Sequence, residues 1–373
     1  YGPFAKKHPF AFMLLEQSLR DYELKRLSNI RKNLSLLKTR SPLIRILVLI
    51  KCFILKIDSR EKSLLLLPKR FNFFEKLVIA SLTMKSIKHR TTPISYIIFK
   101  DKNLNKIIDK ILSQDLYCAL SDQELINQLD EITMKMLSST KKILTLLNVK
   151  HIIASAEMQG MHRLMIEAAK QMDIKFTVLL HGYIQDPYLV AIAPSQADTV
   201  IAWTKQQEEE LKPFLEKINY IGFPFKIKNK SDRMKKNVLV VLEPLELFKE
   251  NVFHLIRQIK SSYPDKKIII RLHPKDRENQ QILKLFKDNK IDLSSRPLEK
   301  ELQECFLTIG TNSSTLIQSH FLGIPTLQIK EYAKFNFEGV SQVNLEDISN
   351  FDALNTRPHD LIDRSRLKSL LSS

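Results

Sequence analysis

Glycine is scarce in this sequence of 373 residues. It occurs 7 times, where an average usage of about 7% would give roughly 26. No glycine lies between Gly2 and Gly160. A loop that cradles a phosphate through its backbone depends on glycines placed close together. A phosphate site built on a glycine-rich loop is therefore excluded from residues 3–159.

Cysteine is scarce too, and metal-binding motifs are missing. The three cysteines, Cys52, Cys118 and Cys305, lie far apart and form no CxxC pair. This spacing indicates neither a disulfide framework nor a zinc site, and it favours a reducing compartment. There is no DxD motif, and the histidines do not cluster at ligand spacing. We therefore expect no metal ion.

Long uninterrupted apolar runs are absent as well. The most apolar early stretch, residues 43–57, is interrupted by Arg45, Lys51 and Lys56, whereas a membrane-spanning helix needs about 20 residues with few or no charges. This stretch is not expected to span a bilayer. Two interpretations stay open for it: an amphipathic helix that lies in a membrane interface, and a buried helix of the first domain.

Acidic residues are rare in the first hundred residues, which carry 21 Lys/Arg against 6 Asp/Glu and hence +15 of the chain's net charge of +18. Such asymmetry favours an anionic partner for this part of the chain, namely a membrane surface, an acidic glycan or a nucleic acid. A solvated basic face without a partner is the alternative.

The apolar pattern predicts a mostly helical section over residues 1–147, followed by short strands that alternate with helices. One long helix is expected over 122–147, after a cap at Ser121. The alternation is typical of βαβ units with a parallel sheet. We expect strands over 94–99, 151–154, 176–180, 199–203, 221–224, 238–242, 267–272, 306–309 and 325–329, and helices over 161–171, 205–215, 245–259, 277–289 and 314–322.

The polar, charged stretch after Pro224 has no periodicity and marks a domain boundary. We predict an N-terminal domain over 1–225, a linker over 226–236, a second domain over 237–355 and a C-terminal helix over 356–373 that crosses back to the first domain. Two successive α/β domains imply a cleft, with ligands at the carboxyl ends of the strands.

Polar side chains follow the predicted strands of the second domain. His273 comes directly after the strand over 267–272, where an imidazole can stabilise a departing phosphate oxygen; a structural or surface role is the alternative. Thr311, Asn312, Ser313 and Ser314 stand in a row between a strand and a helix. A single N-cap needs only one such side chain, so the row favours binding of an anion or a ribose.

Four further residues are expected to bind or activate substrate. Glu243, which directly follows the strand over 238–242, is included among the substrate-binding residues. In the first domain, Glu157 follows the strand over 151–154 and could act as a general base, although it could equally start a helix favourably. His181 and Gly182 follow the strand over 176–180, and His181 could act as a base or a substrate ligand.

Three segments resemble the HP and SS motifs of bacterial capsule and surface-polysaccharide glycosyltransferases with the GT-B fold: 271–276 (RLHPKD), 311–315 (TNSST) and 320–325 (HFLGIP). Sialyl- and polysialyltransferases are nearest in pattern, with capsule Kdo transferases and teichoic-acid polyol-phosphate transferases as cousins. The run over 152–223 is similar to the end of the N-terminal domain in that group. The resemblance covers roughly residues 150–330.

The resemblance implies an α/β fold of the GT-B type, with two Rossmann-like domains facing across a cleft and a helix-rich N-terminal section. It implies inverting transfer from a nucleotide-activated sugar, with the acceptor bound by the domain over 1–225 and the nucleotide sugar by the domain over 237–355. In this transfer His273 would assist departure of the nucleotide phosphate, and Ser313 and Ser314 would bind that phosphate. The family's acidic D/E-D/E-G motif has no clean match, and 156–160 (AEMQG) is the closest string, which makes Glu157 the candidate base.

We therefore expect a metal-independent glycosyltransferase of capsule or lipopolysaccharide assembly, with a CMP-activated acidic sugar such as sialic acid as donor and a glycan or lipid-linked acceptor. It would need no cofactor besides the donor and would be cytoplasmic, docking on the inner membrane through its basic N-terminal section. The alternatives are a CDP-polyol phosphotransferase and then an enzyme like UDP-sugar 2-epimerases. From another class, Phe71, Phe73 and Phe74 beside Lys69 and Arg70 fit nucleic-acid stacking, but no binding module accompanies them.

Overall fold

The computed structural model describes residues 6–9, 11–12, 15, 62–66, 89–91, 102–114, 116–154, 160–180, 184, 195–220, 237–243, 251–274, 276–334, 336–337 and 339–350. The chain divides into two compact units, the first of residues 1–221 and 363–373 and the second of residues 222–362. The predicted linker over 226–236, the C-terminal helix over 356–373 and the strands over 94–99 and 221–224 lie outside the described residues. The predicted domain boundaries therefore stay predictions.

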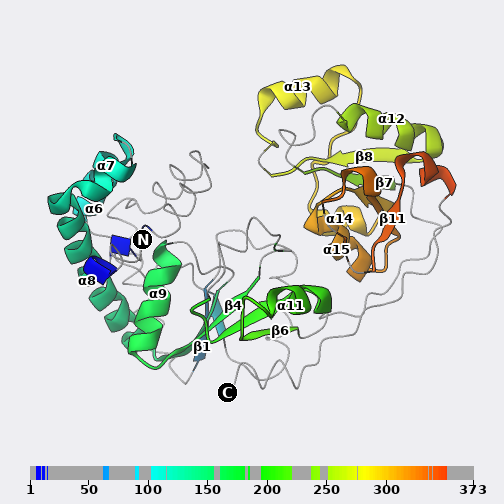
Figure 1. Cartoon of the computed structure of the whole chain (residues 1–373). Coiled ribbons are helices and arrows are strands. Elements are labelled where there is room, and N and C mark those ends of the chain that lie inside the picture. Colours follow the sequence, from blue (N-terminus) through cyan, green and yellow to red (C-terminus); the bar gives the residue numbers. More distant parts are fainter. Residues whose placement is uncertain are drawn as a thin grey trace. The chain divides into compact units, whose positions relative to one another are not determined.

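Unit 1 contains a parallel sheet with the strand order β2-β1-β3-β4-β5-β6. Helices α6 and α7 pack against α8, which packs against α9 (Figure 1). The elements are β1 Lys62–Leu66, β2 His89–Thr91, α6 Lys102–Leu112, α7 Leu116–Ser121, α8 Gln123–Leu146, β3 Val149–Ala154, α9 Gly160–Gln171, β4 Lys175–Leu179, β5 Thr199–Ala202, α11 Lys205–Leu211 and β6 Ile218–Tyr220.

One sequence prediction for unit 1 needs correction, and two strands were not predicted. Strands β1 and β2 join the same parallel sheet as β3. The cap of α8 is Asp122 rather than Ser121, which ends α7. The Asp122 side chain accepts a hydrogen bond from the backbone N–H of Leu125, 3.0 Å away, so the carboxylate satisfies one of the open donors of the first turn.

Unit 2 contains a second parallel sheet, with the strand order β11-β10-β9-β7-β8. Its elements are β7 Asn237–Val241, α12 Val252–Ser262, β8 Lys267–Arg271, α13 Gln280–Asp288, α14 Leu298–Leu302, β9 Cys305–Gly310, α15 Ser314–Phe321, β10 Thr326–Ile329, the 3₁₀ turn η4 Lys330–Tyr332, β11 Ser341–Val343 and the 3₁₀ turn η5 Leu345–Asn350. The predicted α/β class, with two Rossmann-like parallel sheets, is confirmed.

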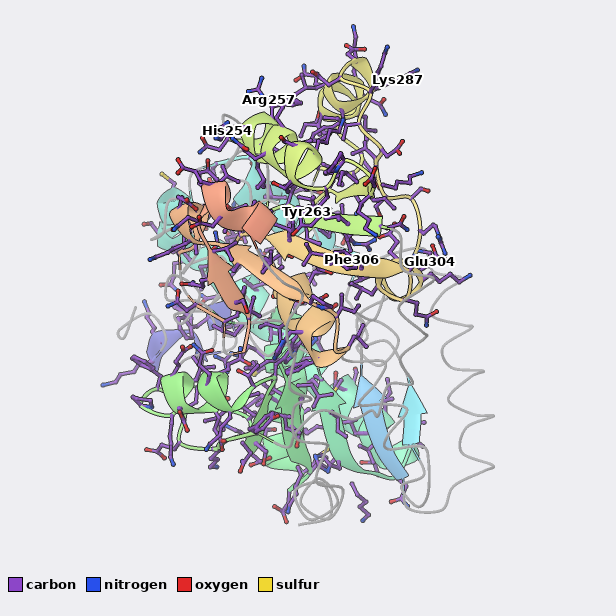
Figure 2. All side chains as sticks on the ribbon, turned by 90° about the vertical axis from the view of Figure 1, so that its right-hand side faces the viewer. His254, Arg257, Tyr263, Lys287, Glu304 and Phe306 are labelled. Carbon is purple, nitrogen blue, oxygen red and sulfur yellow. The ribbon has the colours of Figure 1, made fainter. Side chains whose placement is uncertain are left out.

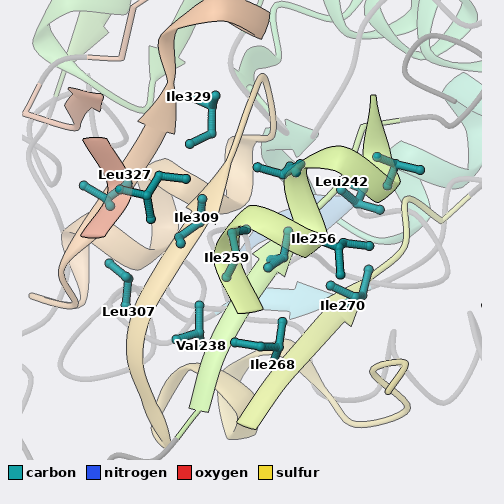
Figure 3. Packing of buried hydrophobic residues seen from close by; sticks show 14 of the residues in the cluster. Val238, Leu242, Ile256, Ile259, Ile268, Ile270, Leu307, Ile309, Leu327 and Ile329 are labelled. Atoms are coloured by element: carbon teal, nitrogen blue, oxygen red, sulfur yellow. The ribbon is translucent and has the colours of Figure 1, made fainter. Parts of the chain in front are cut away.

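The core of unit 2 lies between the sheet and α12. Alternate side chains of four strands point to the same face and are buried, and α12 covers them with its own apolar stripe (Figure 3). The labelled members are Val238, Leu242, Ile256, Ile259, Ile268, Ile270, Leu307, Ile309, Leu327 and Ile329. Full burial of each such side chain stabilises the fold by about 1.5–3 kcal/mol. Because a shift of one strand by one residue would expose these side chains, this face fixes the register of the sheet.

The opposite face of the same sheet carries α15. Thr308 alternates with the core residues of β9, and its hydroxyl oxygen accepts a hydrogen bond from the Ser319 hydroxyl of α15 at 2.7 Å. Helices therefore cover both faces, as expected for a doubly wound parallel sheet. Loops that could hold a ligand are left at the carboxyl ends of the strands.

Candidate functional site

The carboxyl ends of three adjacent strands of unit 2 are aligned. Val241 of β7 pairs with Arg271 of β8 on one side and with Gly310 of β9 on the other. Two residues beyond these partners stand Glu243, His273 and Asn312. The structure therefore brings three sequence-predicted residues to one edge of one sheet, which is where ligands bind in open α/β sheets.

Gly310 lets β9 pass close to β7 at this edge. A Cβ atom at Gly310 would lie 2.6 Å from Val241 Cγ2 and 2.7 Å from the Val241 carbonyl oxygen. Because one of these atoms belongs to the backbone, a larger residue could not be accommodated without moving a strand. The glycine thus brings the polar loop after β9 next to the loop after β7.

Glu243 is the buried acidic group of the site. Its side chain is 9% exposed, and it accepts hydrogen bonds from the Asn312 side-chain amide, 3.3 Å from each carboxylate oxygen, and from the Thr311 hydroxyl at 3.4 Å. Lys334 Nζ lies 3.7 Å from the same carboxylate. A buried carboxylate needs such partners, so these residues form one connected network.

The loop after β9 is also tied to the segment after β10. Asn312 donates to the Tyr332 carbonyl at 2.9 Å and accepts from the Lys334 backbone N–H at 2.7 Å. Gln328, which is fully buried in β10, donates to the Thr311 carbonyl at 2.7 Å. These bonds occupy the Asn312 amide within the protein, so Asn312 and Gln328 hold the loop in place.

Ser313 and Ser314 stand where α15 begins. Ser313 is the N-cap, and its hydroxyl oxygen accepts from the Thr315 backbone N–H at 3.3 Å. Accepting this bond leaves the Ser313 O–H able to donate. Both serines are partly exposed, and the amides of the first helical turn carry partial positive charge. This end of α15 can therefore meet an anion.

His273 is partly buried at the end of β8, two residues after Arg271. Arg271 donates to the Glu301 carboxylate at 2.7 Å, to the Ser294 hydroxyl at 2.9 Å and to the Arg296 carbonyl at 3.1 Å. Burial and then the charge of Arg271 lower the pKa of Arg277, against an opposing effect of Glu301. The end of β8 therefore carries two neighbouring arginines, with Glu301 and the buried Asp276 of the turn after His273 as carboxylates.

The remaining predicted residues, Glu157, His181 and Gly182, lie outside the described residues. Gln328 and Lys334 belong to the network around Glu243 but were not predicted from the sequence. Lys334 follows β10, whose carboxyl end lies at the same edge as those of β7 and β9, so the strand pattern carried a signal for it. Gln328 had none, because it stands within an apolar strand.

In the part of the chain that the structure describes, no three side chains of His, Cys, Asp or Glu gather as a metal centre would require. Nor does any described helix combine the length and apolar character of a membrane span.

The sequence matches no family model and no curated protein. Among solved structures, it is similar to UDP-GlcNAc 2-epimerase from Neisseria meningitidis bound to UDP-GlcNAc, at 14% identity and a TM-score of 0.45 over 74% of this chain and 84% of that one. S. aureus MnaA in a structure with UDP matches at 13% identity and a TM-score of 0.43, over 74% of this chain and 80% of that one. The spinosyn rhamnosyltransferase SpnG matches at 12% identity and a TM-score of 0.39, over 72% of this chain and 80% of that one.

Proposed function

We propose that the chain is a nucleotide-sugar-dependent glycosyltransferase whose donor binds at the carboxyl edge of the sheet of unit 2. The observation that carries this proposal is the alignment of Val241, Arg271 and Gly310, which gathers His273 and the Thr311–Ser314 loop at one edge. A single histidine or a single N-cap would be unremarkable in any fold, whereas their meeting at the ligand edge of a parallel sheet supports a joint role.

The roles follow from what each side chain has available. The phosphate of the leaving nucleotide would lie at the start of α15, where the Ser313 O–H and the first backbone amides can donate to it. His273 would donate to, or protonate, the phosphate oxygen that departs from the sugar. The Glu243 carboxylate would repel a phosphate, and it could instead accept a hydrogen bond from a hydroxyl group of the substrate.

The finer assignments rest on the motif resemblance alone. We propose inverting, metal-independent transfer of an acidic sugar from a CMP-linked donor to a glycan or lipid-linked acceptor in surface-polysaccharide assembly, with Glu157 as base and His181 and Gly182 on the acceptor side. A cytoplasmic location at the inner membrane, contacted by the basic N-terminal section, belongs to the same proposal. The same phosphate site would equally serve a CDP-polyol phosphotransferase or a UDP-sugar 2-epimerase.

Product analysis with a panel of donors tests the proposal. The full chain is incubated with CMP-, CDP- and UDP-linked donors, and nucleotide release and the released sugar are measured by mass spectrometry. A transferase releases CMP with sugar joined to acceptor, a phosphotransferase releases CMP from a CDP-polyol, and an epimerase yields an isomerised sugar. If the folded chain binds none of these donors and turns none over, the enzyme proposal fails.

A matched pair of variants tests whether the reaction takes place at the carboxyl edge of unit 2. His273→Ala removes the imidazole at the carboxyl edge, and His254→Ala removes one from the exposed face of α12. Loss of turnover in the first variant alone supports the assignment. Equal turnover in both variants would show that the reaction does not use His273.

A further inference from the structure

Unit 2 presents exposed basic side chains on two neighbouring helices. Figure 2 shows His254 and Arg257 on α12 and Lys287 on α13 at the outer side of this unit. We call the set the basic helix face; its members are His254, Arg257, Lys260, Lys284, Lys287 and Lys290, all of them exposed. These residues belong to unit 2, whereas the basic residues 1–100 belong to unit 1, and they do not include the carboxyl edge loops around His273.

The two helices form one layer. The rings of Phe253 in α12 and Phe286 in α13 lie with their centroids 5.7 Å apart, and both helices cover the upper side of unit 2 in Figures 1 and 2. The apolar residues of α12 pack into the core, so its charged residues point outward. The basic residues of the two helices therefore belong to one continuous surface.

Basic residues outnumber acidic ones on and beside this surface. Helix α12 contains no Asp or Glu, and α13 contains one, Asp288. The 3₁₀ turn η5, which packs against α12, adds the exposed Glu346 and Asp347, so three carboxylates stand against the five Lys and Arg side chains of the basic helix face. Within the described ranges, no carboxylate pairs with Arg257, Lys260, Lys284 or Lys287. Elsewhere in unit 2, Arg271, Lys267 and Lys334 each have an acidic partner.

Helix stability does not account for the placement of these basic residues. Cations in the last turn of a helix are favoured by the helix dipole, which covers Lys260 and Lys287 but neither Arg257 nor Lys284. Arg257 and Lys260 are three positions apart, as are Lys284 and Lys287, and like charges at this spacing repel. The helices therefore carry unpaired positive charge that their own folding does not need, and an anionic partner would offset the repulsion.

We propose that the basic helix face binds the surface of an anionic lipid bilayer. Lysine and arginine side chains spread over two helices in one layer suit a broad surface of like charge, to which each contributes by simple electrostatic attraction. Single-stranded nucleic acid would also need exposed rings for base stacking. The exposed large apolar side chains in the described part of the chain are Met134, Leu146 and Phe214, all in unit 1, so this face offers none.

Vesicle binding of charge-matched variants tests the inference, which does not depend on the proposed chemistry. The full chain is sedimented with vesicles of equal parts phosphatidylglycerol and phosphatidylcholine, and with vesicles of phosphatidylcholine alone. The test variant combines Arg257→Gln, Lys260→Gln, Lys284→Gln and Lys287→Gln. The control combines Lys106→Gln, Lys142→Gln, Lys150→Gln and Lys212→Gln, exposed lysines of unit 1, and therefore has the same net charge.

We expect the wild-type chain to bind the anionic vesicles only. Each removed charge should weaken partitioning onto the anionic vesicles by roughly fivefold. The partition coefficient of the test variant should therefore fall by roughly a hundredfold or more, while that of the control should fall by no more than about tenfold. Equal losses in both variants, or no binding by the wild-type chain, would overturn the proposal. Tighter binding of the wild-type chain to a single-stranded oligonucleotide at the same salt concentration, lost in the test variant alone, would also overturn it in favour of nucleic acid.

Discussion

The ion pair between Arg271 and Glu301 supports the strand end that carries His273, and its loss should be costly. The two side chains are 12% and 3% exposed, and their charged atoms lie 2.7 Å apart. Breaking a buried pair by removing one partner typically costs 3–5 kcal/mol. In a Glu301→Gln variant Arg271 keeps the Ser294 hydroxyl and the Arg296 carbonyl as acceptors. We therefore expect a loss of about 3 kcal/mol, the lower end of that range.

Urea unfolding of the full chain, followed by far-UV circular dichroism, measures this loss. Trp203 is the single tryptophan and lies in unit 1, so its fluorescence reports separately on that unit. Glu304→Gln is the matched control, because it breaks the pair with Arg296 in which both side chains are more than 40% exposed. Exposed pairs contribute little. A Glu301→Gln variant no less stable than the Glu304→Gln variant would refute the reasoning.

The remaining predictions concern His273, the loop after β9 and one helix cap. His273→Ala should lower turnover by roughly 10²-fold or more without shifting the thermal midpoint; unchanged turnover would remove His273 from the mechanism. Gln328→Leu deprives the Thr311 carbonyl of its donor and should lower the free energy of unfolding by about 1–3 kcal/mol, measured in urea; a loss below about 0.5 kcal/mol would contradict the network. The hydrogen bond from Lys110 holds the pKa of Asp122 below its usual range. The stability that this carboxylate contributes is thus present above its unfolded-state pKa and lost as the pH falls through the lowered value. The stability gap between the wild-type chain and Asp122→Asn, followed by thermal melting, should therefore close in acid; a gap independent of pH would contradict this.

The central strands of both sheets were predictable because buried parallel strands form nearly continuous apolar runs. The expected strands over 238–242 and 306–309 correspond to β7 and β9 within a residue or two. The shortest strands were missed. The sequences of β2 and β11, HRT and SQV, contain little or no apolar signal, and each pairs with a neighbouring strand that lies far away in the sequence or after a loop.

Helix ends were less predictable than helix positions. The helix expected over 205–215 stops at Leu211, because Pro213 has no backbone N–H with which to continue the helical hydrogen bonds. The helix expected from residue 277 begins at Gln280, after Asn279 accepts from two backbone N–H groups of the first turn. Both signals were in the sequence, but the apolar periodicity outweighed them.

The edge residues were predictable and their supporting contacts were not. His273, Glu243 and the Thr311–Ser314 loop each follow an apolar run directly, so the parallel topology alone places them together. The bonds from Gln328 to Thr311 and from Lys334 to Glu243 depend on which strands are neighbours and on how loops close over the sheet. The strand pattern indicates that Lys334 follows a strand at this edge, but no local pattern encodes its contact with Glu243 or the contact of Gln328 with Thr311.

Hydrogen–deuterium exchange of the full chain, with and without CMP, CDP or UDP, tests most directly whether the carboxyl edge of unit 2 binds a nucleotide. We predict that at least one nucleotide slows exchange in peptides that contain His273 and in those that span Thr311–Leu316, while peptides from α12 and α13 are unchanged. Slower exchange confined to other parts of the chain, or none with any of the three nucleotides at high concentration, would contradict the placement of the donor site.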